Sequence, residues 1–229
     1  MARIAVSVAT CLVFAVLPGC TSVGVHDKAA WQRLDFGAAD SVALCLYLDE
    51  GIDEDRARGL VEDAWRDDAP LYRLEMKITG VTLWRRPAFT MDGIIDALRH
   101  EPLTPGCDRI LALIGRHFGD VVWGFLLPEY LGAVNDETMT HGYAIAETAS
   151  LNQLVDSPRS VVRHELYHLL GCDEHFKMAR CYEQIATLKR WKHDHRSDFF
   201  PAWDSINERM LVTREAVNAR LSADFRFER

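Results

Sequence analysis

Hydrophobic residues along the chain change their spacing several times, and each spacing predicts a type of secondary structure. Two compact apolar runs, SVALCLYL at residues 41–48 and RILALI at residues 109–114, are typical of strands that are buried on both faces. Residues 71–84 alternate apolar and polar side chains, which indicates a further strand. Shorter runs at residues 121–127 and 143–147 predict two more strands, joined by a loop that contains Gly132.

Helical spacing occupies the segments between and after these strands. After Asp53, apolar residues recur on one helical face and acidic residues fill the first turn, where they are favourable. Pro158 is suited to open a helix, and Gly171 is suited to end it. The predicted helices are, in chain order, one that starts at Asp53, about Met91–His100, Pro158–Gly171, about Arg180–Lys192 and about Pro201–Leu221.

The order of these elements indicates the fold class. Strands and helices alternate in the first two thirds of the chain, and the last third is helical. Strands that are apolar on both faces and alternate with helices favour a largely parallel sheet covered by helices. We therefore predict an α/β (α+β) fold with a mixed, mostly parallel five-stranded sheet and a helical C-terminal part.

The first 20 residues, MARIAVSVATCLVFAVLPGC, have a different character. Arg3 precedes an apolar run from Ile4 to Leu17, which is too short to span a bilayer comfortably and is typical of a secretory signal peptide. The residues LPGC at 17–20 resemble the lipobox of bacterial lipoproteins. The resemblance implies cleavage before Cys20 and a diacylglyceryl anchor on its sulfur. The protein would then lie in the bacterial cell envelope, in the outer membrane facing the periplasm, with secretion as the alternative.

The same features predict how the chain is divided. Residues 1–19 form the signal peptide, residues 20–38 a short tether and residues 39–229 a single domain. We divide that domain into residues 39–171, with the sheet and the histidine-bearing helix, and residues 172–229, which are helical. A chain of 229 residues is long enough for one good-sized domain, whereas two would be cramped.

Charge and cysteine content narrow the possible functions. The formal net charge of −8 argues against nucleic-acid binding, because no basic stripe is present to neutralise phosphates. Export places the mature chain where disulfides persist. Removal of Cys11 with the signal peptide and use of Cys20 for the lipid leave four cysteines, which allow three pairings: Cys45, Cys107, Cys172 and Cys181.

The stretch HELYHLLGCDEH at residues 164–175 carries the candidate chemistry. His164 and His168 lie about one helical turn apart on the same face, so both imidazoles can reach one metal ion. Glu165 is placed to take a proton from a water molecule on that metal. The surrounding residues are mostly uncharged, unlike those of a surface helix with a chance pair of histidines.

Gly171 comes three residues after His168 and can adopt the left-handed conformation that ends a helix sharply. The next loop can then turn back with a third ligand. His164, Glu165, His168 and Gly171 match the motif H-E-x-x-H-x-x-G-x-x-H/D, so the chain resembles the metzincin zinc peptidases, and most closely the snapalysin-like or archaemetzincin-like branch. The resemblance covers about residues 41–185 and implies a metzincin-like sheet, a zinc-binding active-site helix and Zn²⁺ as the cofactor.

The third ligand departs from the family pattern. The family spacing falls on Glu174, and His175 comes one residue later. Carboxylates and imidazoles both bind zinc, and a loop accommodates one extra residue easily. We favour His175, because imidazole is the commoner third ligand, and keep Glu174 as the alternative. A gluzincin-like site would instead use a glutamate on the next helix, such as Glu183.

The cysteines are expected to form two disulfides. Cys172 and Cys181 bracket the loop with the third ligand, so a bond between them would hold that ligand near the ion. A thiolate ligand from Cys172 would instead imply a structural zinc site. The first and third strands are neighbours in the metzincin sheet, which the chain resembles, and this favours a bond between Cys45 and Cys107.

Two further residues are implied by the resemblance alone. Metzincins place a methionine beneath the metal soon after the third ligand. Met178 comes early for this role, Ile185 stands in the snapalysin-like register, and Met210 is far along the chain. Some metzincins also use a tyrosine to stabilise the oxyanion, and Tyr182 is the candidate here.

The expected function is that of a zinc-dependent endopeptidase, anchored in the bacterial envelope, that hydrolyses peptide bonds of a peptide or protein substrate. Glu165 would be the catalytic base, and His164, His168 and His175 would hold the metal. The substrate would lie along the edge strand at residues 121–127. The non-enzymatic alternative is an envelope lipoprotein with a structural zinc site.

Overall fold

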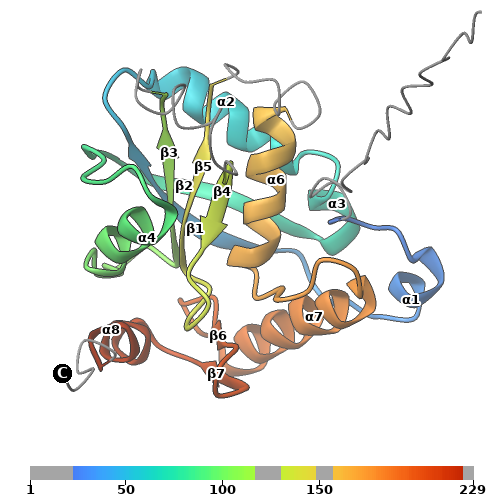
Figure 1. Cartoon of the computed structure of the whole chain (residues 1–229). Coiled ribbons are helices and arrows are strands. Elements are labelled where there is room, and N and C mark those ends of the chain that lie inside the picture. The colour runs from blue at the N-terminus through green and yellow to red at the C-terminus, as the bar shows by residue number, and fades with distance from the viewer. Residues whose placement is uncertain (1–22, 117–129, 148–156, 224–229) are drawn as a thin grey trace, which may run out of the picture.

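The computed structural model describes residues 23–116, 130–147 and 157–223 (Figure 1). The predicted signal peptide at 1–19, Cys20 and the predicted strand at 121–127 lie outside these residues. Within the described ranges, no helix combines the length and the apolar composition that a transmembrane span requires. The described chain forms a mixed α/β fold, as predicted, with seven helices.

A five-stranded sheet forms the centre of the fold, with the strand order β2-β1-β3-β5-β4. The first four strands in this order are parallel, and β4 pairs antiparallel with β5 at one edge. The strands are β1 (Asp40–Leu48), β2 (Leu74–Leu83), β3 (Arg109–Ile114), β4 (Gly132–Val134) and β5 (His141–Ile145). The prediction of a mostly parallel five-stranded sheet is therefore confirmed.

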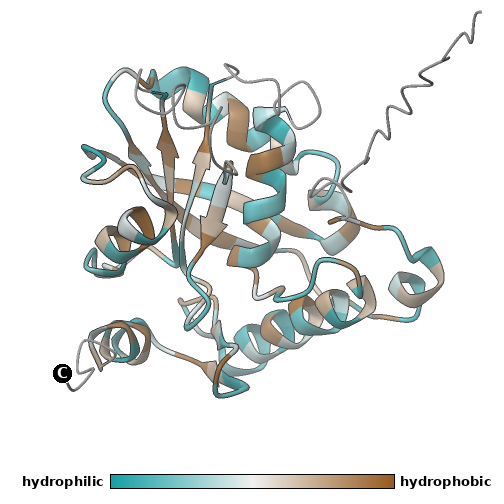
Figure 2. Cartoon of the chain, viewed as in Figure 1, coloured by the Kyte–Doolittle hydropathy of each residue, from teal (hydrophilic) through white to brown (hydrophobic). Residues whose placement is uncertain are grey.

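Helices cover both faces of the sheet, because its central strands are apolar on both sides. All six residues of β3 are buried, and its alternate side chains belong to two different hydrophobic cores. Residues of α2, α6 and α7 fill the first core, and residues of α4 and α8 fill the second. The helices are α1 (Lys28–Gln32), α2 (Glu54–Trp65), α3 (Ala69–Tyr72), α4 (Met91–Arg99), α6 (Pro158–Leu169), α7 (Met178–His195) and α8 (Arg214–Ala223). Figure 2 shows mainly apolar residues on the central strands and a mixture on the covering helices.

Local capping explains why the helix starts predicted at Asp53 and Pro158 are accurate. The Asp53 side chain accepts a hydrogen bond from Arg56 N at the start of α2, and Ser157 accepts one from Ser160 N at the start of α6. Pro158 occupies the first turn of α6, where its missing N–H leaves no hydrogen bond unmade. Such caps involve neighbours in the sequence, so they can be recognised from sequence alone.

The region around Gly132 differs from the prediction of a loop. Its residues Gly132–Val134 form the short strand β4, which pairs with β5 over Gly142–Ala144. Three residues are too few to show an alternating pattern. The conformation of β4 is therefore decided by the strand beside it rather than by its own sequence.

The helix predicted over Pro201–Leu221 is wrong in its first half. That half forms a two-stranded antiparallel hairpin of β6 (Ala202–Asp204) and β7 (Arg209–Leu211). The buried Asp204 carboxylate accepts hydrogen bonds from the backbone and side-chain nitrogens of Asn207, which stabilises the turn instead of a helix. Ile206, in the turn between β6 and β7, is 60% exposed and therefore does not face a core.

The N-terminal segment (residues 23–38), which we expected to be a tether, packs against the domain. It contains α1, and Val23, Ala30 and Phe36 are buried in the first core. The Phe36 ring meets the Tyr72 ring edge-on, with centroids 5.1 Å apart. The apolar residues of this segment have no regular spacing, so their burial could not be predicted from a pattern.

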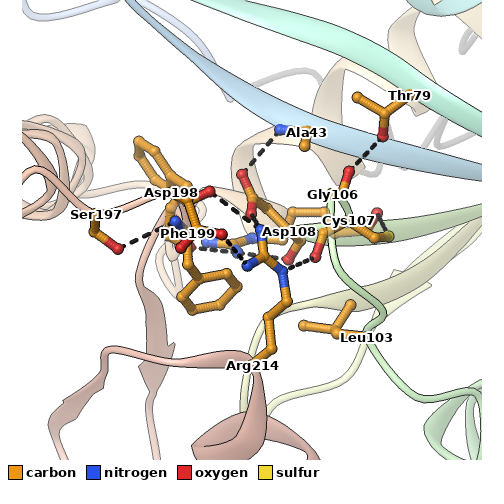
Figure 3. Close-up of polar contacts among 12 residues, drawn as sticks. Ala43, Thr79, Leu103, Gly106, Cys107, Asp108, Ser197, Asp198, Phe199 and Arg214 are labelled. Carbon is orange, nitrogen blue, oxygen red and sulfur yellow. Dashed lines mark hydrogen bonds and ion pairs between the residues drawn. The ribbon is translucent and has the colours of Figure 1, made fainter.

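The C-terminal part is joined to the sheet by a buried polar cluster around Arg214 (Figure 3). Its guanidinium donates to Asp108 Oδ1 and to the carbonyl of Cys107, both at 2.9 Å. The other oxygen of Asp108 accepts from Ala43 N in β1 at 3.0 Å. One arginine thus connects the start of α8 to two strands of the sheet.

Both predicted disulfides are present. Cys45–Cys107 joins β1 to the residues just before β3, which is its neighbour in the sheet. Cys172–Cys181 joins the loop after α6 to the first turns of α7. The second bond encloses the loop that contains His175.

Candidate metal centre

The candidate site is built on α6, which contacts β4 and β5 and has seven buried residues among its 12. Val162, Leu166 and Leu169 are completely buried in the first core and fix the inner side of this helix. The same helix packs against α2 and against β5. The rotation of α6 about its own axis is therefore set by packing, and this rotation decides where its polar residues point.

Three histidine rings converge at the C-terminal end of α6. The Nε2 atoms of His164 and His168 lie 2.9 Å apart. The His175 ring lies 5.1 Å from the His164 ring and 4.8 Å from the His168 ring, between centroids. One nitrogen from each ring falls within 4.8 Å of the other two, which is close enough for all three to bind one ion.

The turn at Gly171 brings His175 back to α6. Gly171 has φ of +91°, a value that side-chain-bearing residues rarely adopt. A methyl group at this position would also lie 3.2 Å from Leu188 and from Trp203, so the chain is close to its neighbours there. The glycine therefore ends the helix and directs the loop with the third histidine towards the first two.

The first residue of that loop orients His168. The Nδ1 atom of His168 donates a hydrogen bond to the carbonyl oxygen of Cys172, the first residue after Gly171, at 2.5 Å. A proton held on Nδ1 leaves the lone pair of Nε2 available for a cation. Burial lowers the pKa of His168 to about 4, so the ring is neutral near pH 7. This is the protonation state that a metal ligand requires.

The structure separates the alternatives for the third ligand. Glu174 does not join the histidine group, and its Oε1 lies 4.0 Å from Arg180 Nη1. Asp173 pairs with the same arginine at 3.4 Å. Glu183, on the exposed side of α7, is also outside the group. Among the described residues, His175 is the one that approaches the two helix histidines as a third donor.

Glu165 lies on the same helix and is buried, with 4% of its surface exposed. Its Oε2 has no hydrogen-bond partner among the described residues. Burial raises the pKa of Glu165 well above its usual value. Burial of a carboxyl oxygen without a hydrogen-bond partner costs stability, which makes Glu165 a candidate for a role other than stability.

Gly132 of β4 provides the space for Glu165. A methyl group at Gly132 would lie 2.5 Å from Glu165 Oε1, which no real contact permits. The backbone of the edge strand therefore closes over the carboxylate because this position carries no side chain. The sequence contains no local signal for this contact, since residues 132 and 165 meet only in the folded chain.

A second polar cluster on α6 is fully paired. The Arg163 guanidinium donates two hydrogen bonds to Asp68, one of them at 2.8 Å. The Tyr167 hydroxyl donates to the same carboxylate at 3.0 Å and contacts the Tyr72 hydroxyl at 3.1 Å. Asp68 thus holds α6 at two points one turn apart, and it was not recognised as important from the sequence.

The structure also places the residues whose roles were implied only by the resemblance, which are the candidate tyrosine and the candidate methionine positions. Tyr182 is buried, and its hydroxyl donates to Gly24 O and accepts from His26 N, so it holds the N-terminal segment rather than facing the histidines. Met178 and Ile185 are buried in α7, and Met210 is partly buried in β7. The expectation that Tyr182 is available to an oxyanion is therefore wrong.

The donor set fits a zinc ion. Three imidazole nitrogens are accepted by Zn²⁺ in catalytic sites, which use three protein ligands and leave a position for water. The Nε2 atoms of His164 and His168 hydrogen-bond to each other at 2.9 Å, and a bound cation would take the place of the shared proton. Glu165, which follows His164 on the same helix, has an oxygen, Oε2, without a hydrogen-bond partner among the described residues.

Comparison with known proteins adds no relative. The chain matches no protein-family model, and no curated protein matches it.

Proposed function

We propose that the protein is a zinc-dependent endopeptidase of metzincin type, anchored in the bacterial cell envelope through Cys20. The observation that supports it most directly is the convergence of three imidazoles from α6 and its following loop, with their nitrogens within 4.8 Å of one another. Glu165 is buried on the same helix, and its Oε2 has no hydrogen-bond partner among the described residues. The LPGC sequence at 17–20 supports the anchor.

In this proposal His164, His168 and His175 hold the ion. Zinc bound there supplies Lewis-acid polarisation of the peptide carbonyl and lowers the pKa of water towards about 7. Glu165 accepts the proton of the attacking water and passes it to the nitrogen of the leaving amine. Closure of the Gly132 backbone over Glu165 keeps bulk water away from this carboxylate.

The substrate is proposed to bind as an extended peptide beside β4. The earlier expectation placed it along residues 121–127, which lie outside the described residues. In the described sheet β4 is an edge strand, and Gly132 places that edge next to Glu165. An extended peptide that pairs with such an edge presents its carbonyls at a regular spacing.

The decisive experiment replaces the base and keeps the ligands. Glu165→Gln is expected to retain one zinc ion per chain and to lower kcat for a peptide substrate by about 10²–10⁴-fold, because the proton acceptor is removed. Zinc is measured by elemental analysis and cleavage with a peptide library, with a chelated sample for comparison. Glu174→Gln, a change of the same chemistry in the ligand loop, should keep both zinc and activity.

Other outcomes would favour the alternatives. Full activity in zinc-loaded Glu165→Gln would exclude the proposed base. Zinc-loaded wild-type protein that cleaves no member of the library would favour an envelope lipoprotein with a structural zinc site. Loss of zinc in Glu183→Gln, with zinc retained in His175→Ala, would favour a gluzincin-type site.

A further inference from the structure

The N-terminal segment is fixed to the domain from its first described residue. Val23 is 4% exposed and belongs to the first core. The Tyr182 hydroxyl donates to Gly24 O at 2.9 Å and accepts from His26 N at 3.0 Å and Asp27 N at 3.4 Å. The chain is thus held by side-chain burial and by three hydrogen bonds to one hydroxyl within five residues.

This attachment lies beside the metal-binding elements. A methyl group at Gly24 would lie 2.6 Å from Arg163 Nη2, so the segment crosses directly over the residue that precedes His164. Tyr182 follows Cys181, whose disulfide partner Cys172 accepts the hydrogen bond from His168. The N-terminal segment therefore contacts the domain beside the helix and the loop that carry the three histidines.

The distance from Cys20 to this point is limited by covalent geometry. Only Thr21 and Ser22 separate Cys20 from Val23. Four extended residues span at most about 14 Å, so a lipid on Cys20 must lie within that distance of Gly24. The contact between Gly24 and Arg163, the Arg163 side chain, one step along α6 to His164 and the His164 side chain together add about 20 Å, so the histidine cluster lies within about 35 Å of the lipid attachment.

We infer that the metal centre is held next to the bilayer, and that its substrates are peptide segments of membrane-attached proteins close to the bilayer surface. The inference rests on the proposed function, because it requires both the lipid on Cys20 and the peptidase activity. A long tether would let the site reach substrates at any height. Docking of residues 23–38 removes that freedom and raises the effective concentration of nearby segments only.

The test uses the full-length lipidated protein in phosphatidylcholine vesicles. A cleavable peptide is attached to lipid in the same vesicles through polyproline spacers, which extend by about 3.1 Å per residue. Spacers of about 10 residues place the scissile bond about 30 Å from the surface, and spacers of about 30 residues place it about 90 Å away. We expect cleavage of the distant peptide to be at least about tenfold slower.

An insertion variant provides the matched comparison. A flexible Gly/Ser insertion of about 30 residues between Ser22 and Val23 leaves the domain unchanged and lengthens the tether. It should bring the rates for the near and distant peptides to within about threefold of each other. Cys20→Ser protein, which is free in solution, should show no dependence on spacer length.

Each result has a distinct meaning. Equal cleavage of both peptides by lipidated wild-type protein would overturn the inference and leave the peptidase proposal intact. Mass spectrometry that shows no lipid on Cys20 would also overturn it, while cleavage of a soluble peptide would still support the enzyme. Failure of zinc-loaded protein to cleave any soluble peptide would overturn both.

Discussion

Two faces of helix α6 differ in how completely their buried polar groups are hydrogen-bonded. On one face of α6, Arg163 and Tyr167 donate to Asp68, and both oxygens of this carboxylate accept hydrogen bonds. On the adjacent face, the Nε2 atoms of His164 and His168 hydrogen-bond to each other at 2.9 Å, whereas Glu165 Oε2 has no partner among the described residues. The two faces are only one residue apart in the sequence.

This difference in hydrogen bonding distinguishes a polar cluster that stabilises the fold, around Asp68, from the candidate catalytic group, around Glu165. Paired buried groups repay the cost of losing water, whereas unpaired ones do not. The Asp68 cluster thus adds polar anchors to the packing that sets the rotation of α6, and this rotation brings His164 and His168 together with His175. Stability on one face therefore supports the face that carries the histidines and the buried Glu165 carboxyl group.

The largest expected effect comes from breaking the paired face. Asp68→Ala removes the acceptor of Arg163 and Tyr167 and should lower the free energy of unfolding by about 3–4 kcal/mol. Asp67→Ala, the neighbouring change, breaks an exposed pair with Arg159 and should cost less than about 1 kcal/mol. Urea unfolding measures both, and similar losses in the two variants would contradict the assignment.

His141 is a buried histidine that lies outside the candidate metal centre and whose two ring nitrogens both have partners within the fold. His141 Nε2 contacts the Glu101 carbonyl at 2.8 Å, and Nδ1 contacts Thr140 Oγ1 at 2.7 Å. Burial lowers the pKa of His141 from 6.5 to about 4. Between these values the unfolded chain binds more protons than the folded one, so stability contributed by neutral His141 is lost as pH falls from about 6.5 to about 4.

The size of this loss is on the order of 3 kcal/mol. It is measured as the difference between wild-type and His141→Gln protein in urea unfolding at several pH values, because glutamine does not titrate. Chelator is present throughout, so that metal release does not contribute. Parallel pH profiles in the two proteins would show that His141 is not the group responsible.

The smallest expected effect concerns the loop that completes the histidine cluster. The double change Cys172→Ala and Cys181→Ala frees the loop that carries His175 and the carbonyl that orients His168. Zinc affinity should fall by about 10–30-fold, in the range known for partners that orient metal ligands. The matched double change Cys45→Ala and Cys107→Ala should leave zinc affinity within about twofold, and equal losses would argue against the loop effect.

The features predicted correctly are those whose cause lies within a few residues. The Asp53 and Ser157 caps set helix starts, and continuous apolar runs identify β1 and β3. The errors fall where distant partners decide. Residues 132–134 form a strand because β5 lies beside them, and residues 201–211 form a hairpin around the buried Asp204.

The sequence by itself determined the chemistry that is available at the centre of this protein. Spacing of four residues on a helix places His164 and His168 on one face, and Gly171 permits the turn after them, because both are properties of the local backbone. Only the tertiary structure decided that His175 rather than Glu174 approaches them, that Gly132 lies against Glu165, and that Asp68 pairs with two residues of α6. Those contacts join segments far apart in the chain, and no local pattern specifies which of many possible neighbours a buried polar group will meet.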